Sequence, residues 1–236
     1  MKRKSQVRLG HLPLGHIPRV VGVVTSPEFK LGARARRFRC DVLEYRLDQL
    51  QGVENWLEAC VSVEAAGLPV ILTPRLKAEG GAWTHRDADR LPIYETALKD
   101  LSAVDVELQS DIVEEVGRLA KRRRKCCIIS FHDFGKTPPL PALKRVAERA
   151  QRLGSVIKIT TMTHTKADVE TLRSLLACRW EKPICVMGMG ALGKATRTAF
   201  PALGSCLTYG YLDKPAAPGQ LSAAMLVARL RGLRPA

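Results

Sequence analysis

Short apolar segments alternate with longer amphipathic ones along most of the chain. Eight apolar segments are predicted to form strands: Val20–Ser26, Asp41–Asp48, Val70–Arg75, Val104–Leu108, Cys126–His132, Val156–Met162, Ile184–Met189 and Cys206–Tyr211. Helical patterns lie between or after them, over Glu54–Ala66, Asp87–Leu101, Asp111–Arg124, Leu140–Leu153, Lys166–Cys178, Leu192–Ala202 and Gln220–Leu233. This regular alternation indicates parallel strands joined by helical crossovers.

Eight strand–helix units in one chain favour a closed (β/α)₈ barrel of the TIM type, an α/β fold. An open doubly wound sheet is the alternative, but the glycine-rich turn that such folds place after their first strand is missing, and Val24-Thr-Ser-Pro27 stands there instead. Residues 1–236 are therefore expected to form a single barrel domain. Residues 1–18 precede the first strand and are expected to be an extension or a plug of the barrel.

The chain is strongly basic, with 38 Lys and Arg residues against 23 Asp and Glu residues and a net charge of +15. Basic proteins often bind nucleic acid, but here the charges are spread out and the one dense run, Lys121–Lys125, contains no aromatic residue. No nucleic-acid partner is expected. A hydrophobic fraction of 46% fits an ordinary globular protein.

The chain has seven cysteines, an odd number, and no CxxC pair. Reduced, buried thiols explain this pattern better than a disulfide framework or a zinc site. The basic start is not followed by an apolar signal-peptide core, and no apolar run approaches the ~18 residues of a membrane span. A cytoplasmic protein without membrane contact is expected.

Active sites of such barrels lie at the carboxyl ends of the strands, so polar residues there are candidates. Period-two alternation places Glu44 and Arg46 on one face of the second strand. In a barrel this face points inward, and the two side chains are expected to neutralise each other. Arg75 ends the third strand, where either substrate binding or a loop salt bridge would explain it.

Lys158 stands between two isoleucines inside the sixth strand. Lysine is rarely buried without a partner or a role. Burial disfavours the charged ammonium and so favours the neutral amine that forms imines. His132 ends the fifth strand, where it is either structural or a general acid and base.

Met187 and Met189 share a face at the end of the seventh strand, either as core filling or as an apolar wall beside an imine. Arg197 follows, either as a bidentate carboxylate ligand or as a solvated charge. The Pro- and Gly-containing loop over residues 211–220 lies where an active-site lid or an ordinary connection would be expected.

In order and spacing, these residues resemble the type I 3-dehydroquinate dehydratase family, whose members form a Schiff base in the shikimate pathway. The His132-Asp-Phe and Ala217-Pro-Gly-Gln220 motifs are specific, and the remaining pieces add weight together. The matching pieces are Glu44-Tyr-Arg46-Leu-Asp48, Arg75-Leu-Lys-Ala-Glu79-Gly-Gly, Ile129–Pro138, Ile157-Lys158-Ile, Met187-Gly-Met189-Gly, Arg197, Gly204-Ser205 and Ala217–Gln220.

The resemblance implies that Lys158 forms an imine with the C3 ketone of 3-dehydroquinate, and that His132 removes the C2 proton and assists loss of the C1 hydroxyl. Glu79 would orient the histidine, and Arg197 would bind the carboxylate. The other implied substrate-binding residues are Glu44, Arg46, Arg75, Met187, Met189, Ser205, Ala216 and Gln220. No metal or organic cofactor is implied, and members of the family are often homodimers.

Three positions depart from the family pattern. Leu203 replaces a frequent aromatic residue, Ala216 replaces a frequent lid serine and Gly135 replaces a frequent glutamate. Loss of one hydrogen bond is worth about 0.5–1.5 kcal/mol, so a changed KM or lid closure is expected rather than lost chemistry. Alternatives are a class I aldolase, a basic nucleic-acid-binding protein, and a catalytically inactive barrel with an interaction role.

Overall fold

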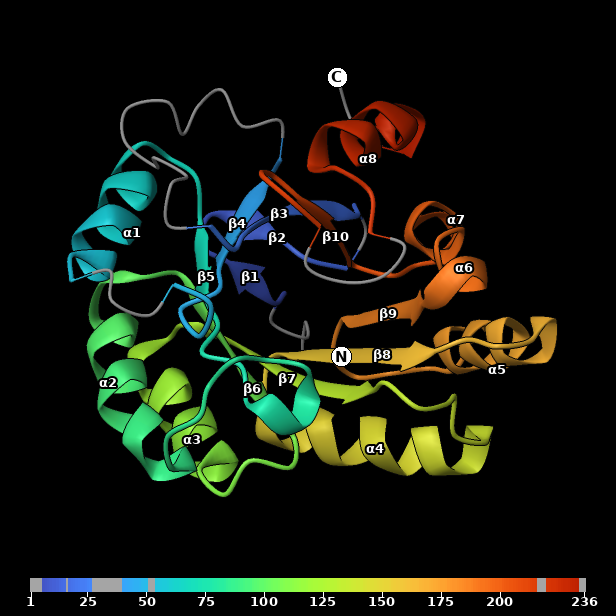
Figure 1. Cartoon of the computed structure of the whole chain (residues 1–236), viewed down its shortest axis with the longest axis horizontal. Coiled ribbons are helices and arrows are strands. Elements are labelled where there is room, and N and C mark those ends of the chain that lie inside the picture. Colours follow the sequence, from blue (N-terminus) through green and yellow to red (C-terminus); the bar gives the residue numbers. More distant parts are fainter. Residues whose placement is uncertain (1–5, 16, 27–39, 51–53, 216–219, 234–236) are drawn as a thin grey trace.

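The computed structural model of this chain describes residues 6–15, 17–26, 40–50, 54–215 and 220–233. Eight parallel strands form one curved sheet in the spatial order β10, β3, β4, β5, β6, β7, β8, β9 (Figure 1). These strands are β3 (Arg19–Val24), β4 (Val42–Tyr45), β5 (Val70–Leu72), β6 (Ala103–Glu107), β7 (Cys126–Asp133), β8 (Val156–Met162), β9 (Ile184–Met189) and β10 (Leu207–Tyr211). All eight predicted strands are present, and the (β/α)₈ prediction is confirmed.

Helices surround the strands, as Figure 1 shows. They are α1 (Trp56–Ala65), α2 (Leu91–Asp100), α3 (Val113–Arg123), α4 (Leu140–Leu153), α5 (Lys166–Leu176), α6 (Gly190–Gly193), α7 (Thr196–Ala202) and α8 (Ala223–Arg229). Short 3₁₀ turns occur at η2 (Lys77–Glu79), η3 (Asp87–Arg90) and η4 (Arg231–Leu233). The predicted helix over Leu192–Ala202 is divided between α6 and α7, because the Thr196 hydroxyl bonds both the Gly193 carbonyl at 2.6 Å and the Gly188 amide at 2.9 Å.

Each strand is buried on both faces, which explains the nearly continuous apolar segments in the sequence. Side chains such as Leu43, Tyr45 and Leu72 pack outward against the helices in one large cluster. Side chains such as Val21 and Ile128 pack inside the barrel in a second cluster. Polar inner residues beyond this apolar floor therefore stand out as candidates for a site.

The barrel closes between β9 and β10 with little direct strand pairing. The Cys206 amide donates to the Ile184 carbonyl at 2.8 Å, and the Ser205 hydroxyl accepts from the Val186 amide at 3.0 Å. The same hydroxyl donates to the Leu207 carbonyl at 3.2 Å. Ser205 therefore joins two strands at the amino-terminal end of β10, and the substrate-binding role expected for it does not fit its position.

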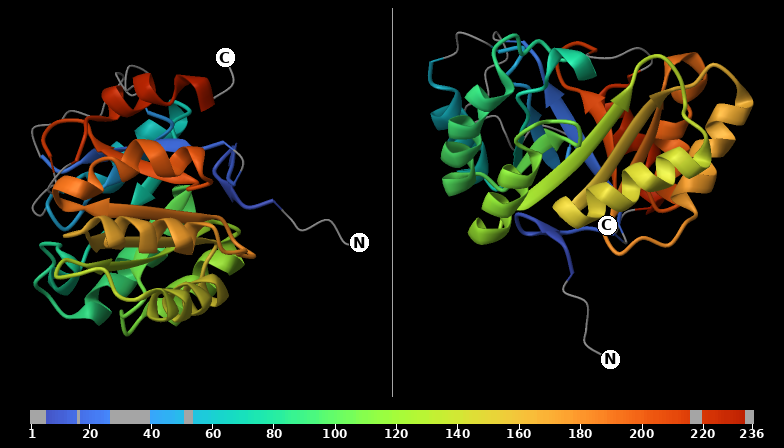
Figure 2. Two further views of the ribbon diagram at one scale, coloured as in Figure 1. Left: turned by 90° about the vertical axis from the view of Figure 1, so that its right-hand side faces the viewer. Right: turned by 90° about the horizontal axis from the view of Figure 1, so that it is seen from below.

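The segment before β3 contains a small hairpin of β1 (Arg8–Leu9) and β2 (Leu12–Pro13). It lies at the end of the barrel where the strands begin (Figure 2). Leu9 is fully buried and Leu14 nearly so, and both join the apolar cluster inside the barrel. This end is thus plugged by side chains, which leaves the carboxyl ends of the strands for a site.

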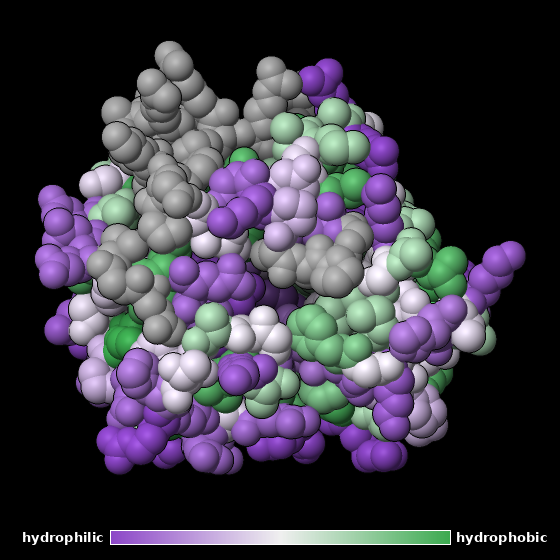
Figure 3. Space-filling view, viewed as in Figure 1, coloured by the Kyte–Doolittle hydropathy of each residue, from purple (hydrophilic) through white to green (hydrophobic). Residues whose placement is uncertain are grey.

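Basic residues of the Lys121–Lys125 run lie at the carboxyl end of α3, where cations complement the helix dipole. Lys121 to Arg124 are exposed there. On the face seen in Figure 3, hydrophilic residues alternate with small hydrophobic areas. Among the described residues, the helices are too short or too polar to cross a lipid bilayer.

Replacing the plug residue Leu9 with alanine should destabilise the protein. The side chain is completely buried, so its loss leaves a cavity that costs about 2–5 kcal/mol in the free energy of unfolding. Urea unfolding measures this change. Leu203→Ala is the matched control, because Leu203 is 51% exposed and its loss should cost less than about 0.5 kcal/mol. Equal losses in the two variants would contradict the plug.

Candidate active site

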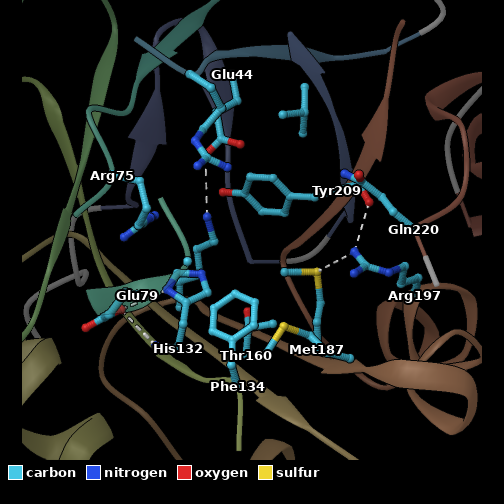
Figure 4. A pocket seen from close by; sticks show the side chains of 15 residues that line it. Glu44, Arg75, Glu79, His132, Phe134, Thr160, Met187, Arg197, Tyr209 and Gln220 are labelled. Atoms are coloured by element: carbon cyan, nitrogen blue, oxygen red, sulfur yellow. Dashed lines mark hydrogen bonds and ion pairs between the residues drawn. The ribbon is translucent and has the colours of Figure 1, made fainter. Parts of the chain in front are cut away.

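A cavity opens at the carboxyl ends of the strands. Ten of the twelve predicted site residues line it: Glu44, Arg46, Arg75, Glu79, His132, Lys158, Met187, Met189, Arg197 and Gln220. The other lining residues are Val23, Gly80, Phe134, Thr160 and Tyr209. Figure 4 shows these side chains converging from separate strands. Ser205 lies outside the cavity, and Ala216 lies outside the described residues.

Lys158 projects from the middle of β8 into this cavity and is 4% exposed. Its Nζ donates to Asp105 Oδ2 at 2.8 Å and lies 3.5 Å from Glu44 Oε1. Nζ also lies 4.0 Å from the centre of the Tyr209 ring. The amine of Lys158 is therefore buried between two carboxylates and the face of an aromatic ring.

Asp105 ties the lysine to a buried arginine. Its Oδ1 accepts from Arg75 Nη2 at 2.8 Å and from the Ser130 hydroxyl at 2.6 Å. Burial alone would raise the pKa of Asp105, but Arg75 and Lys158 outweigh it and hold that pKa well below its ordinary value. Asp105 is therefore a carboxylate, the permanent counter-charge of Lys158.

The charge network continues away from the cavity through a second carboxylate of β6. Glu107 Oε1 lies 3.3 Å from Arg75 Nη1, and its Oε2 accepts from Arg90 Nη1 at 2.6 Å. Arg90 has no exposed surface and also bonds Asp87. Arg75 is therefore fixed in a buried chain of alternating charges, and it also lines the cavity, where its predicted contact with substrate stays a prediction.

The expected neutralisation of Glu44 by Arg46 is wrong. Arg46 instead bonds Asp48 through two contacts, Nε to Oδ1 at 2.9 Å and Nη2 to Oδ2 at 2.8 Å. Glu44 accepts from the Thr73 hydroxyl at 2.9 Å and faces Lys158. The strand β4 ends at Tyr45, so Arg46 no longer follows the period-two alternation that linked the pair.

His132 is held by Glu79 from the η2 turn. Glu79 Oε2 lies 2.9 Å from both the backbone nitrogen and the ring Nδ1 of His132. A carboxyl oxygen that accepts from the amide also favours a proton on Nδ1. The lone pair of the neutral ring then sits on Nε2, which is the nitrogen available to act as a base.

The protonation of this pair suits a base at neutral pH. Burial, together with the positive charges of Arg75 and Lys158, lowers the pKa of His132 well below its ordinary value. Burial, helped by the negative charges of Glu107 and Asp105 and opposed by Arg75, raises the pKa of Glu79 to about 7. His132 is therefore neutral near pH 7, while Glu79 changes its charge there.

Phe134 covers the histidine at the cavity mouth. The two rings are stacked with centres 6.4 Å apart, and Phe134 is 41% exposed. Gly80 makes this placement possible, because a Cβ atom there would lie 2.2 Å from the Phe134 ring. Its φ of +75° also favours glycine. The glycine after Glu79 therefore serves the packing over His132.

Arg197 of α7 is 3% exposed and carries no carboxylate partner among the described residues. Its Nη1 donates to the Tyr209 carbonyl at 3.1 Å and contacts Met187 Sδ at 3.6 Å. Burial lowers the pKa of Arg197 to about 10. A buried guanidinium without an anion is poised for an anionic ligand group, and Figure 4 shows it beside Gln220.

Several buried polar atoms in the cavity make no hydrogen bond with any described residue. Six buried side-chain nitrogen or oxygen atoms of the described residues make no hydrogen bond, and four of them belong to cavity residues: Glu79 Oε1, Thr160 Oγ1, Arg197 Nε and the Tyr209 hydroxyl. Buried polar atoms are normally hydrogen-bonded, so their concentration here indicates a ligand rich in polar groups. Within the described part of the chain, no group of three His, Cys, Asp or Glu side chains is arranged to hold a metal ion.

Asp105, Glu107, Thr160 and Tyr209 belong to the site or its charge network but were not predicted from the sequence. The two carboxylates interrupt the apolar strand Ala103-Val-Asp-Val-Glu107 in the same way that Lys158 interrupts its own strand. That signal was available. Thr160 and Tyr209 fit ordinary strand patterns, so their inward direction becomes evident only from the register of the barrel.

Known proteins resemble this chain over most of its length. The family model described as Type I 3-dehydroquinase matches residues 21–234. The 3-dehydroquinate dehydratase of Methanosarcina barkeri is 36% identical over 227 residues, covering 91% of this chain and 94% of that protein. That of Methanothermobacter thermautotrophicus is 35% identical over 200 residues, covering 84% and 87%.

Solved structures of 3-dehydroquinate dehydratases have the same fold as this chain. The 3-dehydroquinate dehydratase from Geobacillus kaustophilus superposes with a TM-score of 0.86 at 23% identity, covering 97% of both chains. The type I enzyme from Clostridium difficile, solved with covalent modified comenic acid, has a TM-score of 0.84 at 25% identity, covering 98% of both chains.

Glu79→Gln should remove an inflection near pH 7 from the profile of kcat/KM against pH. In the unmodified protein the carboxyl, with its pKa of about 7, ionises as the pH rises. A carboxylate at this position would stabilise an imidazolium at His132, so activity that depends on His132 as a base should rise through this pH. Glutamine can still accept from the His132 amide but does not titrate. An unchanged inflection in the variant would assign it to another group.

Proposed function

Because this chain belongs to the type I 3-dehydroquinase family, it is a shikimate-pathway hydro-lyase that dehydrates 3-dehydroquinate, and we propose that Lys158, His132 and Glu79 carry out the chemistry. The observation that supports this assignment most directly is the amine of Lys158. It lies buried in a polar cavity, between two carboxylates and an aromatic ring.

The substrate carboxylate binds Arg197. This guanidinium is buried and has no anionic partner among the described residues, so the ligand supplies the missing charge. Arginine presents a planar fork that matches a carboxylate with two parallel hydrogen bonds. Binding at Arg197 on the β9–β10 side orients the ring toward Lys158 and His132. The hydroxyl groups meet Gln220 and the unpartnered atoms of Glu79 and Thr160.

Lys158 activates the C3 ketone as an imine. Its ammonium gives up a proton, the neutral amine attacks C3 and the ketone oxygen leaves as water. The positive iminium then withdraws electrons from C2 and makes the C2 proton more acidic. Asp105 and Glu44 stabilise the nitrogen while it is cationic, both before attack and in the iminium.

His132 then acts as base and acid. Its neutral Nε2 takes the C2 proton, and the resulting imidazolium is stabilised by Glu79 through the 2.9 Å contact at Nδ1. The same proton assists departure of the C1 hydroxyl as water. Hydrolysis of the imine releases 3-dehydroshikimate and restores Lys158. Met187 and Met189, both almost fully buried, form an apolar wall beside the reacting groups.

We further propose a cytoplasmic enzyme. All seven cysteines are free thiols and five of them are buried, as expected in a reducing compartment. The family resemblance predicts a homodimer.

Lys158→Met should abolish both turnover and the covalent adduct with 3-dehydroquinate that borohydride reduction traps. Methionine keeps most of the chain length but has no amine. Mass spectrometry of the intact protein, followed by peptide mapping, locates the adduct. His132→Ala should still form the adduct, while kcat falls roughly 10²–10⁴-fold, the usual contribution of a general base. His85→Ala, at an exposed position, is the control and should leave both readouts unchanged. An adduct at another lysine would refute the assignment.

Arg197→Gln should lower kcat/KM by roughly 10²–10³-fold, mainly through KM, because loss of one partner of a buried charge pair weakens binding by about 2–5 kcal/mol. Steady-state kinetics with 3-dehydroquinate measures the change. Lys194→Gln removes an exposed positive charge three residues earlier and should have little effect. If the two variants behaved alike, Arg197 would not be the carboxylate ligand.

A further inference from the structure

We propose that Tyr209 is a further substrate-contacting residue in imine formation: its ring supports the cationic nitrogen of Lys158, and its hydroxyl donates a hydrogen bond to the ketone oxygen that the substrate loses. This inference rests on the proposed role of Lys158. It concerns the step before dehydration, in which the carbon–nitrogen bond forms.

The ring of Tyr209 is placed by the strand register. Tyr209 pairs with Val21 across β10 and β3 and points to the inside of the barrel, where it is 4% exposed. Its ring centre lies 4.0 Å from Lys158 Nζ. A cation within ~6 Å of an aromatic face is attracted by the ring, and the attraction strengthens where water is excluded. The iminium carries its charge on this same nitrogen.

The hydroxyl of Tyr209 is buried and has no hydrogen-bond partner in the part of the chain that the structure describes. Figure 4 shows the ring extending across the pocket, with the hydroxyl directed toward the side of Glu44 and Arg75. Phenylalanine would fill the same space without leaving a buried donor unpaired, so packing does not account for the oxygen. A ligand oxygen beside Lys158 does.

The hydroxyl also keeps its proton. Burial, followed by the charge of Glu44, raises the pKa of Tyr209 well above its ordinary value. Tyr209 therefore acts as a fixed hydrogen-bond donor and transfers no proton in the step proposed here.

The step balances without a further reactant. The ammonium loses a proton, Nζ forms a bond to C3 and the carbonyl electron pair moves to oxygen. This oxygen gains negative charge as the bond forms, and a donor aimed at it stabilises the transition state. The oxygen then takes up two protons and leaves as water. The three hydrogens of the ammonium end as one on the iminium nitrogen and two in the water.

The experiment is a rapid-quench measurement of imine formation. Enzyme and 3-dehydroquinate are mixed, quenched with borohydride at increasing times and analysed for the Lys158 adduct by mass spectrometry. Tyr209→Phe keeps the ring and should slow adduct formation roughly 10-fold, the usual effect of one hydrogen bond to a developing charge. Tyr209→Leu also loses the ring and should slow it further.

Thermal unfolding separates this role from a structural one. Because the hydroxyl has no partner among the described residues, Tyr209→Phe should unfold at the same temperature as the unmodified protein or higher. Tyr45→Phe is the matched control: Tyr45 is a buried tyrosine of β4 that faces the outer core, away from the cavity. It should form the adduct at the unmodified rate.

Two results would overturn the proposal, and they are distinguishable. If Tyr209→Phe forms the adduct at the unmodified rate with unchanged kcat/KM, the hydroxyl has no role and Tyr209 is a core residue. If the unmodified protein itself forms no adduct at Lys158, the proposed function fails and this inference fails with it.

Discussion

A positive charge inside the barrel is the constraint that organises the site. Lys158 points into the interior of a closed sheet, where its ammonium has almost no contact with solvent and must meet a carboxylate. Asp105 supplies that negative charge. A lone buried carboxylate would be equally unfavourable, and Asp105 also forms an ion pair with Arg75. Glu107 and Arg90 continue the alternation outward to η3. One buried amine on β8 thus accounts for the buried charges of Asp105 and Glu107 on β6, of Arg75 after β5 and of Arg90 in η3.

The barrel separates stability from chemistry along its axis. The end where the strands begin is filled by the hairpin and by apolar side chains, with Ser205 joining β9 and β10. The opposite end carries the charges. Apolar packing at the floor of the barrel offsets the unfavourable free energy of burying charged groups at the site end. The packing between the outer faces of the strands and the helices holds both ends in position.

The fold was readable from the sequence because parallel strands buried on both faces leave long apolar signals, and all eight were located. Lys158 and His132 stood out for the same reason, as polar residues in apolar strands. Asp105 carries the same signal, and its omission was avoidable. The pairing of Glu44 with Arg46 was wrong because it assumed that β4 continues through Arg46, whereas the strand ends at Tyr45. Ser205 was predicted to bind substrate because it belongs to a family motif, but the sequence does not show where that motif lies in the barrel. Tyr209 could not be predicted as a site residue because the sequence does not show that its ring points into the barrel.

One positive charge of the site, that of Arg197, has no negatively charged partner among the described residues. Lys158 pairs with Asp105, Arg75 with Glu107 and Arg46 with Asp48, but Arg197 lacks a carboxylate among the described residues. In the proposed function, the anionic substrate completes the set. Its negative charge should favour the protonated form of His132 at the step in which that ring takes a proton, so we expect substrate binding and the basicity of His132 to be coupled. Burial and the neighbouring positive charges lower the pKa of His132 and keep its ring neutral before substrate binds.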